Sequence, residues 1–402
     1  MENNSYRKLC VFSSDPIKEY YDKGEIKKRY FNPENFFDEV HIISFIDQDI
    51  DESKVKILVG KAKLKIHSIG KISIRERAKN LERVKKLVSE INPDVIRAYN
   101  SLLQGWFAAK CAVTLKKPFL LSLHTQYDHR RKLLKKIDFK KYLFLKYTER
   151  FIEPYVIKHA SKIIIVYKII EPYVIKHGHE NPEYIPNKVE TDRFSKSIVI
   201  DGLPKPLVLS IGNLIKEKNH ECIILAMKNL DAHCLIIGKG ENKKKLLELI
   251  DSKNLKNKIS IIDSVPHSKI QNYYKSATIF ALAYDPELEG LPMPVMEALA
   301  TGLPVVIPQP KSGLSDDLQG IVMYSERKPV GFSHHINELL NDEKMRKQMK
   351  IKGLEKSKDF DSNKIEEKEA HIYSKLIKLE NNWKYLILKL EQVSYRIIID
   401  QK

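Results

Sequence analysis

PLVLSIGNLIKEKNHECIILAMKNLDAHCLIIG, residues 206–238, is the stretch that decides the fold. Two short apolar runs, at 206–212 and 233–238, enclose a helical pattern at 220–230. A short run that is apolar throughout is typical of a strand covered on both faces. A strand, a helix and a second strand in succession therefore predict parallel strands joined by a crossover helix.

The same alternation runs through both halves of the chain. Further helices are expected at 74–92, 101–117, 242–253 and 267–277, and further strands at 9–14, 39–45, 94–99, 118–124, 162–167, 258–263, 278–283 and 304–308. We predict an α/β fold with two Rossmann-like doubly wound domains that face a cleft. Ligands of such sheets bind beyond the carboxyl ends of the strands, so site residues are expected in the loops that follow strands.

The chain length and one polar segment suggest where the domains divide. A chain of 402 residues is too long for one ordinary core. The segment PNKVETDRFSKSIVIDGLPKP is rich in proline and polar residues, which is typical of a connection between domains. The predicted parts are a first domain at 1–188, a linker at 189–206, a second domain at 207–364, and a helical segment at 365–402 that packs back on the first domain.

The composition is that of a soluble globular protein with an affinity for anions. Hydrophobic residues make up 43% of the chain and charged residues 30%, and 70 Lys and Arg against 52 Asp and Glu leave a net charge of +18. The four cysteines are far apart and form no C-x-x-C pair, which predicts reduced core thiols and a cytoplasmic protein. No apolar window is long enough to predict a transmembrane helix.

Polar loops with glycine follow two strands of the second domain. Gly212, Asn213 and Lys218 come after one strand, and Gly238 and Gly240 come after the next. Glycine permits close backbone approach, the following helix presents unpaired N–H groups, and lysine adds a positive charge suited to phosphate. Taken alone, however, these loops fit no complete dinucleotide or P-loop motif.

A third stretch, PELEGLPMPVMEALATGLPVVIP at 286–308, contains two glutamates eight positions apart. Pro292 and Pro294 suit the first turn of a helix, and Glu297 would lie one turn in, near the positive end of the helix dipole. Charge complementarity would by itself explain Glu297, and a solvated loop would explain Glu289.

Together these segments resemble the family-4 retaining glycosyltransferases of the GT-B fold (glycosyl transferases group 1). That family typically reads E-G-F-G-L-P-x-x-E-A-M-A-x-G-x-P-V-V in this region, and the motif G-R-L-x-x-x-K-G precedes it. Matching positions in this chain are Gly212, Leu214, Lys218, Glu289, Gly290, Glu297, Ala298, Ala300, Gly302, Pro304, Val305 and Val306. The segment YIPNKVETDRF at 184–194 is similar to the family's domain junction. The resemblance covers about residues 90–380.

The resemblance implies a role for each matching residue. Lys218 would hold the diphosphate of a nucleotide-sugar, Glu297 the ribose, and Glu289 the donor sugar. His124, at the end of a first-domain strand, would reach that sugar across the cleft, although a structural histidine is an equal alternative. The implied catalytic residues are His124 and Glu289, and the remaining donor-binding residues are Gly212, Asn213, Gly238, Gly240, Val265, His267, Gly290, Leu291 and Met293. No metal or other cofactor is implied.

Five positions depart from the family pattern. Asn213 stands where arginine is usual, Lys188 replaces the glycine of P-N-G, and Asp316 stands where glutamate is common. Leu291 and Pro292 stand where Phe-Gly is common, which removes one backbone N–H donor. These changes affect the choice of donor more than the reaction class.

The implied function is transfer of a sugar from a nucleotide-sugar to a glycan or lipid-linked acceptor, with retention, in cell-surface polysaccharide or glycoconjugate synthesis. The alternatives are a nucleic-acid-binding protein, an inactive transferase-like binding protein and a sugar-nucleotide epimerase of the same fold. Only the net charge favours the first, and we expect no nucleic-acid partner. Acidic triplets at 47–49 and 49–51 resemble the metal motif of another transferase fold, but such triplets are common in exposed loops.

The run RRKLLKKIDFKKYLFLKYTER at 130–150 interleaves lysine with apolar residues. It fits a helix with a solvated cationic face, or a peripheral contact with an anionic membrane on its inner, cytoplasmic side. The stretch at 381–402 would either add to that face or pack on the first domain.

Overall fold

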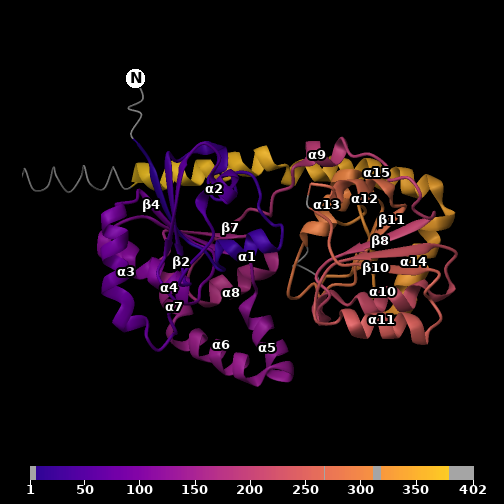
Figure 1. Ribbon diagram of the computed structural model, residues 1–402, viewed down its shortest axis with the longest axis horizontal. Helices are drawn as coiled ribbons and strands as arrows, with labels where there is room; N and C mark the ends of the chain where they lie inside the picture. Colours follow the sequence, from indigo (N-terminus) through magenta and orange to yellow (C-terminus); the bar gives the residue numbers. More distant parts are fainter. Residues whose placement is uncertain (1–5, 267, 311–317, 380–402) are drawn as a thin grey trace, which may run out of the picture.

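The computed structural model describes residues 6–266, 268–310 and 318–379, which form two α/β domains side by side (Figure 1). His267, Asp316 and the stretch at 381–402 lie outside the described residues.

The first domain contains a seven-stranded parallel sheet in the order β3-β2-β1-β4-β5-β6-β7. Its strands are β1 (Lys8–Phe12), β2 (Glu39–Ser44), β3 (Lys63–Ser68), β4 (Val95–Ala98), β5 (Phe119–Leu123), β6 (Lys162–Ile165) and β7 (Glu183–Tyr184). The central strands are buried on both faces, as their apolar runs predict. The strand order reverses between β1 and β4, and ligands bind at such switch points.

The second domain contains a six-stranded parallel sheet in the order β10-β9-β8-β11-β12-β13. Its strands are β8 (Leu207–Ile211), β9 (His233–Ile237), β10 (Ile259–Ile262), β11 (Ile279–Ala281), β12 (Val305–Pro308) and β13 (Met323–Ser325). The order reverses between β8 and β11. The prediction of two doubly wound domains is therefore confirmed.

Helices cover both faces of each sheet. In the first domain they are α1 (Ile17–Asp22), α2 (Glu52–Val55), α3 (Arg77–Ile91), α4 (Leu103–Leu115), α5 (Tyr127–Ile137), α6 (Phe139–Phe151), α7 (Glu153–Lys158) and α8 (Glu171–Lys176). In the second they are α9 (Thr191–Ser195), α10 (His220–Ala226), α11 (Lys243–Ser252), α12 (Ile270–Ser276), α13 (Met293–Thr301), α14 (Pro329–Asn341) and α15 (Glu343–Ser357). Helix α3 shows the principle: Val84, Val88 and Ile91 recur at helical spacing and are buried.

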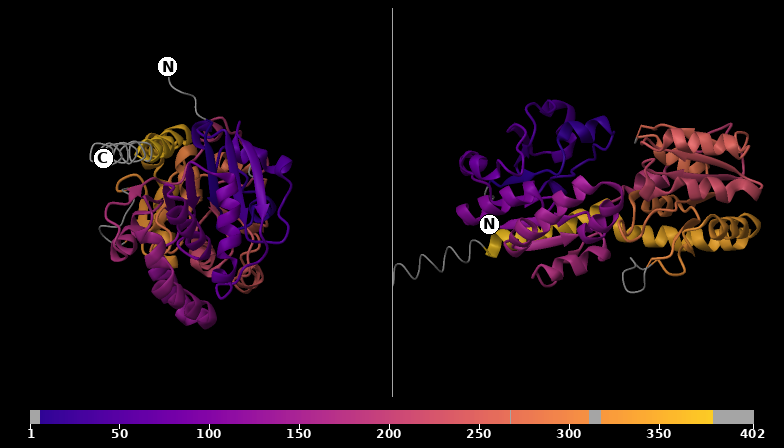
Figure 2. Two further views of the ribbon diagram at one scale, coloured as in Figure 1. Left: turned by 90° about the vertical axis from the view of Figure 1, so that its left-hand side faces the viewer. Right: turned by 90° about the horizontal axis from the view of Figure 1, so that it is seen from below.

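After α15 the chain returns to the first domain as a helix at 362–379, drawn in yellow along the top of Figure 1 and seen from two other sides in Figure 2. Ile365, Tyr373 and Leu376 join the core cluster that also holds residues of β1 and β2. Glu369 accepts two hydrogen bonds from the buried Arg97 of β4, at 3.1 and 3.2 Å.

The segment between the sheets also contributes to a core. Phe194 of α9 is buried against Tyr274 of α12, with ring centroids 5.8 Å apart. Val189 is buried as well and bridges to Asp361, where the chain leaves the second domain. The two connections between the domains therefore lie side by side.

The cysteines and the helices bear on two further expectations. All four cysteines are buried and unpaired, as expected for core thiols. Within the described ranges, no helix has the length and apolar character needed to cross a membrane.

Candidate functional site

The centre of the candidate site is an ion pair at the carboxyl edge of the second sheet. Lys218 ends the 3-10 turn η4 (Lys216–Lys218) in the loop after β8, and Glu289 lies in the loop after β11. The Lys218 ammonium donates a hydrogen bond to the Glu289 carboxylate. Lys218 is buried and Glu289 is partly exposed. The structure thus brings together two residues that are 71 positions apart in the sequence and sit on neighbouring strands.

Gly238 and Gly240 hold the loop after β9 against the loop after β8. A Cβ atom at Gly238 would lie 1.9 Å from the carbonyl oxygen of Gly212, and one at Gly240 would lie 2.4 Å from that of Leu214. The Leu214 N–H donates to the Lys239 carbonyl at 2.7 Å. These glycines therefore have a packing reason as well as the donor-binding role that the resemblance implies.

Glu297 is buried in α13, on the fifth residue of the helix. Its carboxylate accepts a hydrogen bond from the Tyr274 hydroxyl at 2.8 Å. Glu297 and Met293 line a small cavity together with Lys27 of the first domain. A buried carboxylate that faces the other domain is better placed for a ligand than for helix stabilisation alone.

The approach to α13 presents backbone donors. Within the described residues, no acceptor receives the N–H groups of Gly290 and Leu291, whereas the Gly290 carbonyl accepts from the Tyr284 hydroxyl at 2.8 Å. The helix begins directly after Pro292, whose carbonyl accepts the N–H of Val295 at 3.0 Å. Such N–H groups at a helix N-terminus suit an anion, and the substitution at Pro292 removes only one of them.

His124 follows β5 in the first domain, and its ring lies 5.7 Å from that of Tyr99. Its Nε2 atom is buried and has no hydrogen-bond partner in the described structure. Burial, together with the nearby Arg97 charge, lowers the pKa of His124 to about 4. The imidazole is therefore neutral at physiological pH, which suits hydrogen bonding to a sugar hydroxyl rather than charge stabilisation.

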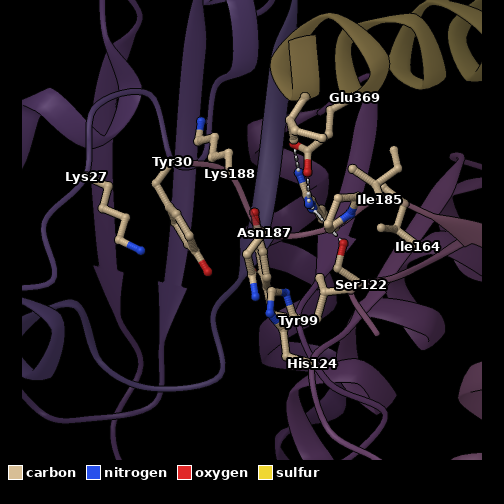
Figure 3. A pocket seen from close by; sticks show the side chains of 14 residues that line it. Lys27, Tyr30, Tyr99, Ser122, His124, Ile164, Ile185, Asn187, Lys188 and Glu369 are labelled. Atoms are coloured by element: carbon tan, nitrogen blue, oxygen red, sulfur yellow. Dashed lines mark hydrogen bonds and ion pairs between the residues drawn. The ribbon is translucent and has the colours of Figure 1, made fainter. Parts of the chain in front are cut away.

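Lys27 lines the candidate site, although no motif in the sequence points to it. It lies in the loop after α1, and it lines both the cavity of Glu297 and a pocket of about 40 Å³ that contains His124. Figure 3 shows Lys27, Tyr99 and His124 bordering that pocket. Burial lowers the pKa of Lys27, and the Glu297 charge opposes this effect. Lys27 thus connects the two predicted halves of the site.

An ion pair and a histidine–carboxylate contact join α5 to the loops after β8 and β11. Arg130 Nη1 lies 2.9 Å from Glu217 Oε1, one residue before Lys218. His129 Nδ1 lies 3.1 Å from Glu287 Oε2, two residues before Glu289. The first domain therefore contacts both loops that supply the central ion pair.

A cavity of about 800 Å³ opens beside His124 in the first domain. Loops after β1, β4 and β5 and the first turn of α4 line it with polar groups, which include Asp15, Asn100 and Gln104. Its aromatic lining comes from Tyr20, Tyr30, Tyr99, Tyr127 and Phe144. Aromatic rings beside hydrogen-bonding groups provide the two contacts that sugars use, stacking and hydroxyl recognition.

The other predicted residues fall into different environments. Asn213 is exposed, and Val265 is partly buried after β10 and packs on the core of the second domain. Lys188, which replaces a family glycine, donates to the Arg29 carbonyl at 3.1 Å and to Glu366 at 2.8 Å. It therefore fixes the domain connection, and it also lines the cavity of Glu297 and the pocket of His124.

The acidic triplets near residue 49 have structural partners. Asp49 accepts the backbone N–H groups of Ile17 and Lys18, at 2.9 and 2.6 Å, and so caps α1. Asp51 caps α2 through the N–H of Ser53 at 2.9 Å. These contacts explain both carboxylates without a metal ion.

Comparison with protein families agrees with this geometry. Residues 38–193 match the model named Glycosyltransferase Family 4, and residues 193–356 match the model named Glycosyl transferases group 1. The chain belongs to the family-4 glycosyltransferases. The two matches divide at residue 193, within the connection between the sheets, and the resemblance inferred from the motifs is confirmed.

Curated relatives of this glycosyltransferase include two bacterial enzymes. One is the N-acetylgalactosamine-N,N'-diacetylbacillosaminyl-diphospho-undecaprenol 4-alpha-N-acetylgalactosaminyltransferase of Campylobacter jejuni, 31% identical over 46% of this chain and 51% of the relative. The other is the amylovoran biosynthesis glycosyltransferase AmsD of Erwinia amylovora, 30% identical over 38% of this chain and 44% of the relative. The chain thus spans about half the length of these relatives.

Solved structures show the same fold over most of this chain. The Anabaena protein HepE in complex with UDP-glucose has a TM-score of 0.68 at 16% identity, covering 92% of this chain and 99% of that one. A glycosyltransferase from Rickettsia africae also has a TM-score of 0.68 at 16% identity, covering 93% and 99%. At such identities the likeness concerns the fold alone.

Proposed function

We propose that this protein transfers a sugar from a nucleoside-diphosphate sugar to a hydroxyl group of a glycan or lipid-linked acceptor, with retention of the anomeric configuration, in cell-surface polysaccharide or glycoconjugate synthesis. The observation that carries the proposal is the Lys218–Glu289 ion pair at the carboxyl edge of the second sheet. Parallel sheets of this kind bind ligands at that edge. The family membership and the Anabaena complex with UDP-glucose support the donor class.

The donor diphosphate lies between Lys218 and the backbone N–H groups of Gly290 and Leu291. These groups stabilise the negative charge that grows on the phosphate as the glycosidic bond breaks. Glu297 accepts hydrogen bonds from the ribose hydroxyls, with Tyr274 fixing its orientation. Because Lys218 and the amides supply the positive field, the proposal requires no metal.

The acceptor occupies the cavity beside His124. Its sugar stacks on the tyrosines that line the cavity, and its hydroxyls meet Asn100, Gln104 and Asp15. Burial raises the pKa of Asp15, which favours a carboxyl that exchanges hydrogen bonds with hydroxyls. A lipid-linked acceptor is supported by the name of the Campylobacter relative, which specifies a diphospho-undecaprenol substrate.

Retention follows from attack on the face that the diphosphate leaves. The bond from the anomeric carbon to the phosphate oxygen breaks, the acceptor oxygen bonds to that carbon, and its proton passes to the departing phosphate. Glu289 is already paired with Lys218, so it orients the donor rather than acting as a nucleophile.

The test is a panel of nucleotide-sugars measured for thermal stabilisation, then for release of nucleoside diphosphate, with the anomeric configuration of the product determined by NMR. One donor should raise the melting temperature by mass action and yield a retained glycoside. Stabilisation without turnover would indicate an inactive binding protein, and an epimerised nucleotide-sugar would indicate an epimerase. An inverted product would refute retention.

A further inference from the structure

The helices α5 and α6 form a basic and apolar projection on the first domain. Only the base of this projection, where α5 contacts loops of the second domain, lies beside the proposed donor site. The two helices extend away from the body of the first domain, as Figures 1 and 2 show. A single residue, Asp138, joins them, and its carboxylate accepts the N–H of Lys141 at 3.0 Å to cap α6. The pair therefore meets the solvent as one ordered unit.

The outer side of α6 carries a stripe of large apolar side chains. Phe139, Leu143, Tyr147 and Phe151 recur every four residues and hence lie along one side of the helix. Their exposed fractions are 59%, 52%, 37% and 55%. The buried positions of α6 are different ones, Leu145 and Thr148, so packing within the domain does not account for the stripe. An exposed patch of this kind marks a contact surface.

Positive charges lie on α5 and in the first turn of α6, the helix that carries the stripe. Lys132, Lys135, Lys136 and Lys140 are exposed, and within the described ranges none of them has an acidic group at ion-pair distance. The acidic residues of the pair are already engaged, since Asp138 pairs with Lys141 and Glu149 pairs with Lys146. A partner surface that complements α5 and α6 is therefore both apolar and anionic.

We propose that this face, residues 132–151, docks the protein on an anionic bilayer. A bilayer supplies hydrocarbon for the apolar stripe and anionic headgroups for the lysines at once, without requiring a matching protein shape. Phe144, beside the stripe, also lines the acceptor cavity together with His124. Docking would therefore place that cavity beside the membrane surface. This step rests on the proposed function, because it explains how a lipid-linked acceptor reaches the site.

The experiment is co-sedimentation of the full chain with vesicles of phosphatidylcholine, alone or with about 30% phosphatidylglycerol. Wild type should bind the anionic vesicles and lose most binding when the salt rises to about 0.5 M. Phe139→Ser with Leu143→Ser, and separately Lys135→Gln with Lys136→Gln, should each lower the partition coefficient by about tenfold. Val330→Ser with Ile351→Ser is the matched control, since these apolar side chains on the second domain are even more exposed than Phe139 and Leu143.

Equal binding of wild type and the Phe139/Leu143 variant would overturn the proposal, as would equal binding to neutral and anionic vesicles. A dimer that this variant dissociates, seen by sedimentation velocity, would identify a second copy of the chain as the partner instead. Donor turnover with a short soluble acceptor, measured without vesicles, separates the two proposals. Turnover without vesicle binding would refute the docking proposal and leave the transferase proposal standing. Vesicle binding without turnover would refute the transferase proposal and leave the docking proposal standing.

Discussion

Lys218 is a buried ammonium group whose charge is met by Glu289. A buried cation needs such a partner, because its desolvation is costly when it stands alone. The ion pair keeps the Lys218 ammonium group in place. In the proposed donor complex, the diphosphate is a second anion for that group.

Lys218→Met should lower kcat/KM for the donor by about 10²–10³-fold, because the cation that meets the developing phosphate charge is lost. It also leaves the Glu289 carboxylate unpaired beside an anionic substrate. The measurement is steady-state release of nucleoside diphosphate. Lys244→Met, at an exposed position on α11, is the control and should match wild type. A variant at 218 with unchanged kcat/KM would remove this residue from the mechanism.

Two buried histidines give the protein a predictable response to acid. Burial lowers the pKa of His124 and of His220 to about 4. The unfolded chain takes up these protons near pH 6.5, so stability is complete above that value and falls as the pH drops toward 4. Melting temperatures across this range should decline, and His220→Gln should make the decline shallower. A melting temperature that stays level from pH 6.5 to 4.5 would contradict the lowered pKa values of these two histidines.

The helix at 362–379 follows the second domain in the sequence, but it packs on the first domain and stabilises it. Arg97 is fully buried, donates to Glu369 and to the Tyr373 hydroxyl at 2.7 Å, and also contacts Ser122. Its charge contributes to the low pKa of His124. The helix at 362–379 thus influences His124 through Arg97, which Glu369 holds in place.

Glu369→Ala should destabilise the protein by about 3–5 kcal/mol, because it leaves the buried Arg97 charge without its carboxylate. Urea unfolding of the first domain measures this loss. Glu367→Ala changes an exposed carboxylate on the same helix and should alter stability by less than about 0.5 kcal/mol. Equal stability of the two variants would show that the ion pair contributes little.

The sequence predicted the elements whose signal is local. The central strands were found because each is a continuous apolar run, and the donor loops because strand, loop and helix follow one another at 279–301. Strand β3 was missed because its residues, KLKIHS, alternate polar and apolar as an edge strand does. Strands β7 and β13 are only two and three residues long. Lys27 could not be found, since its place beside Glu297 arises only when the two domains pack.

The two domains share the site, and each supplies a part that the other lacks. The second domain provides the cation, the amides and the carboxylates, and the first provides His124, Lys27 and the acceptor cavity. Arg130 and His129 of the first domain contact Glu217 and Glu287 of the second, beside Lys218 and Glu289. In the proposed mechanism, transfer therefore depends on groups from both domains rather than on either sheet alone.

The most direct test is a crystal structure with the nucleotide-sugar that stabilises the protein most in the panel. The expected result is a diphosphate within hydrogen-bond distance of Lys218 Nζ and of the Gly290 or Leu291 N–H, with the ribose hydroxyls on Glu297. A donor bound elsewhere, with the Lys218–Glu289 pair and Glu297 untouched, would contradict the assignment of the donor site.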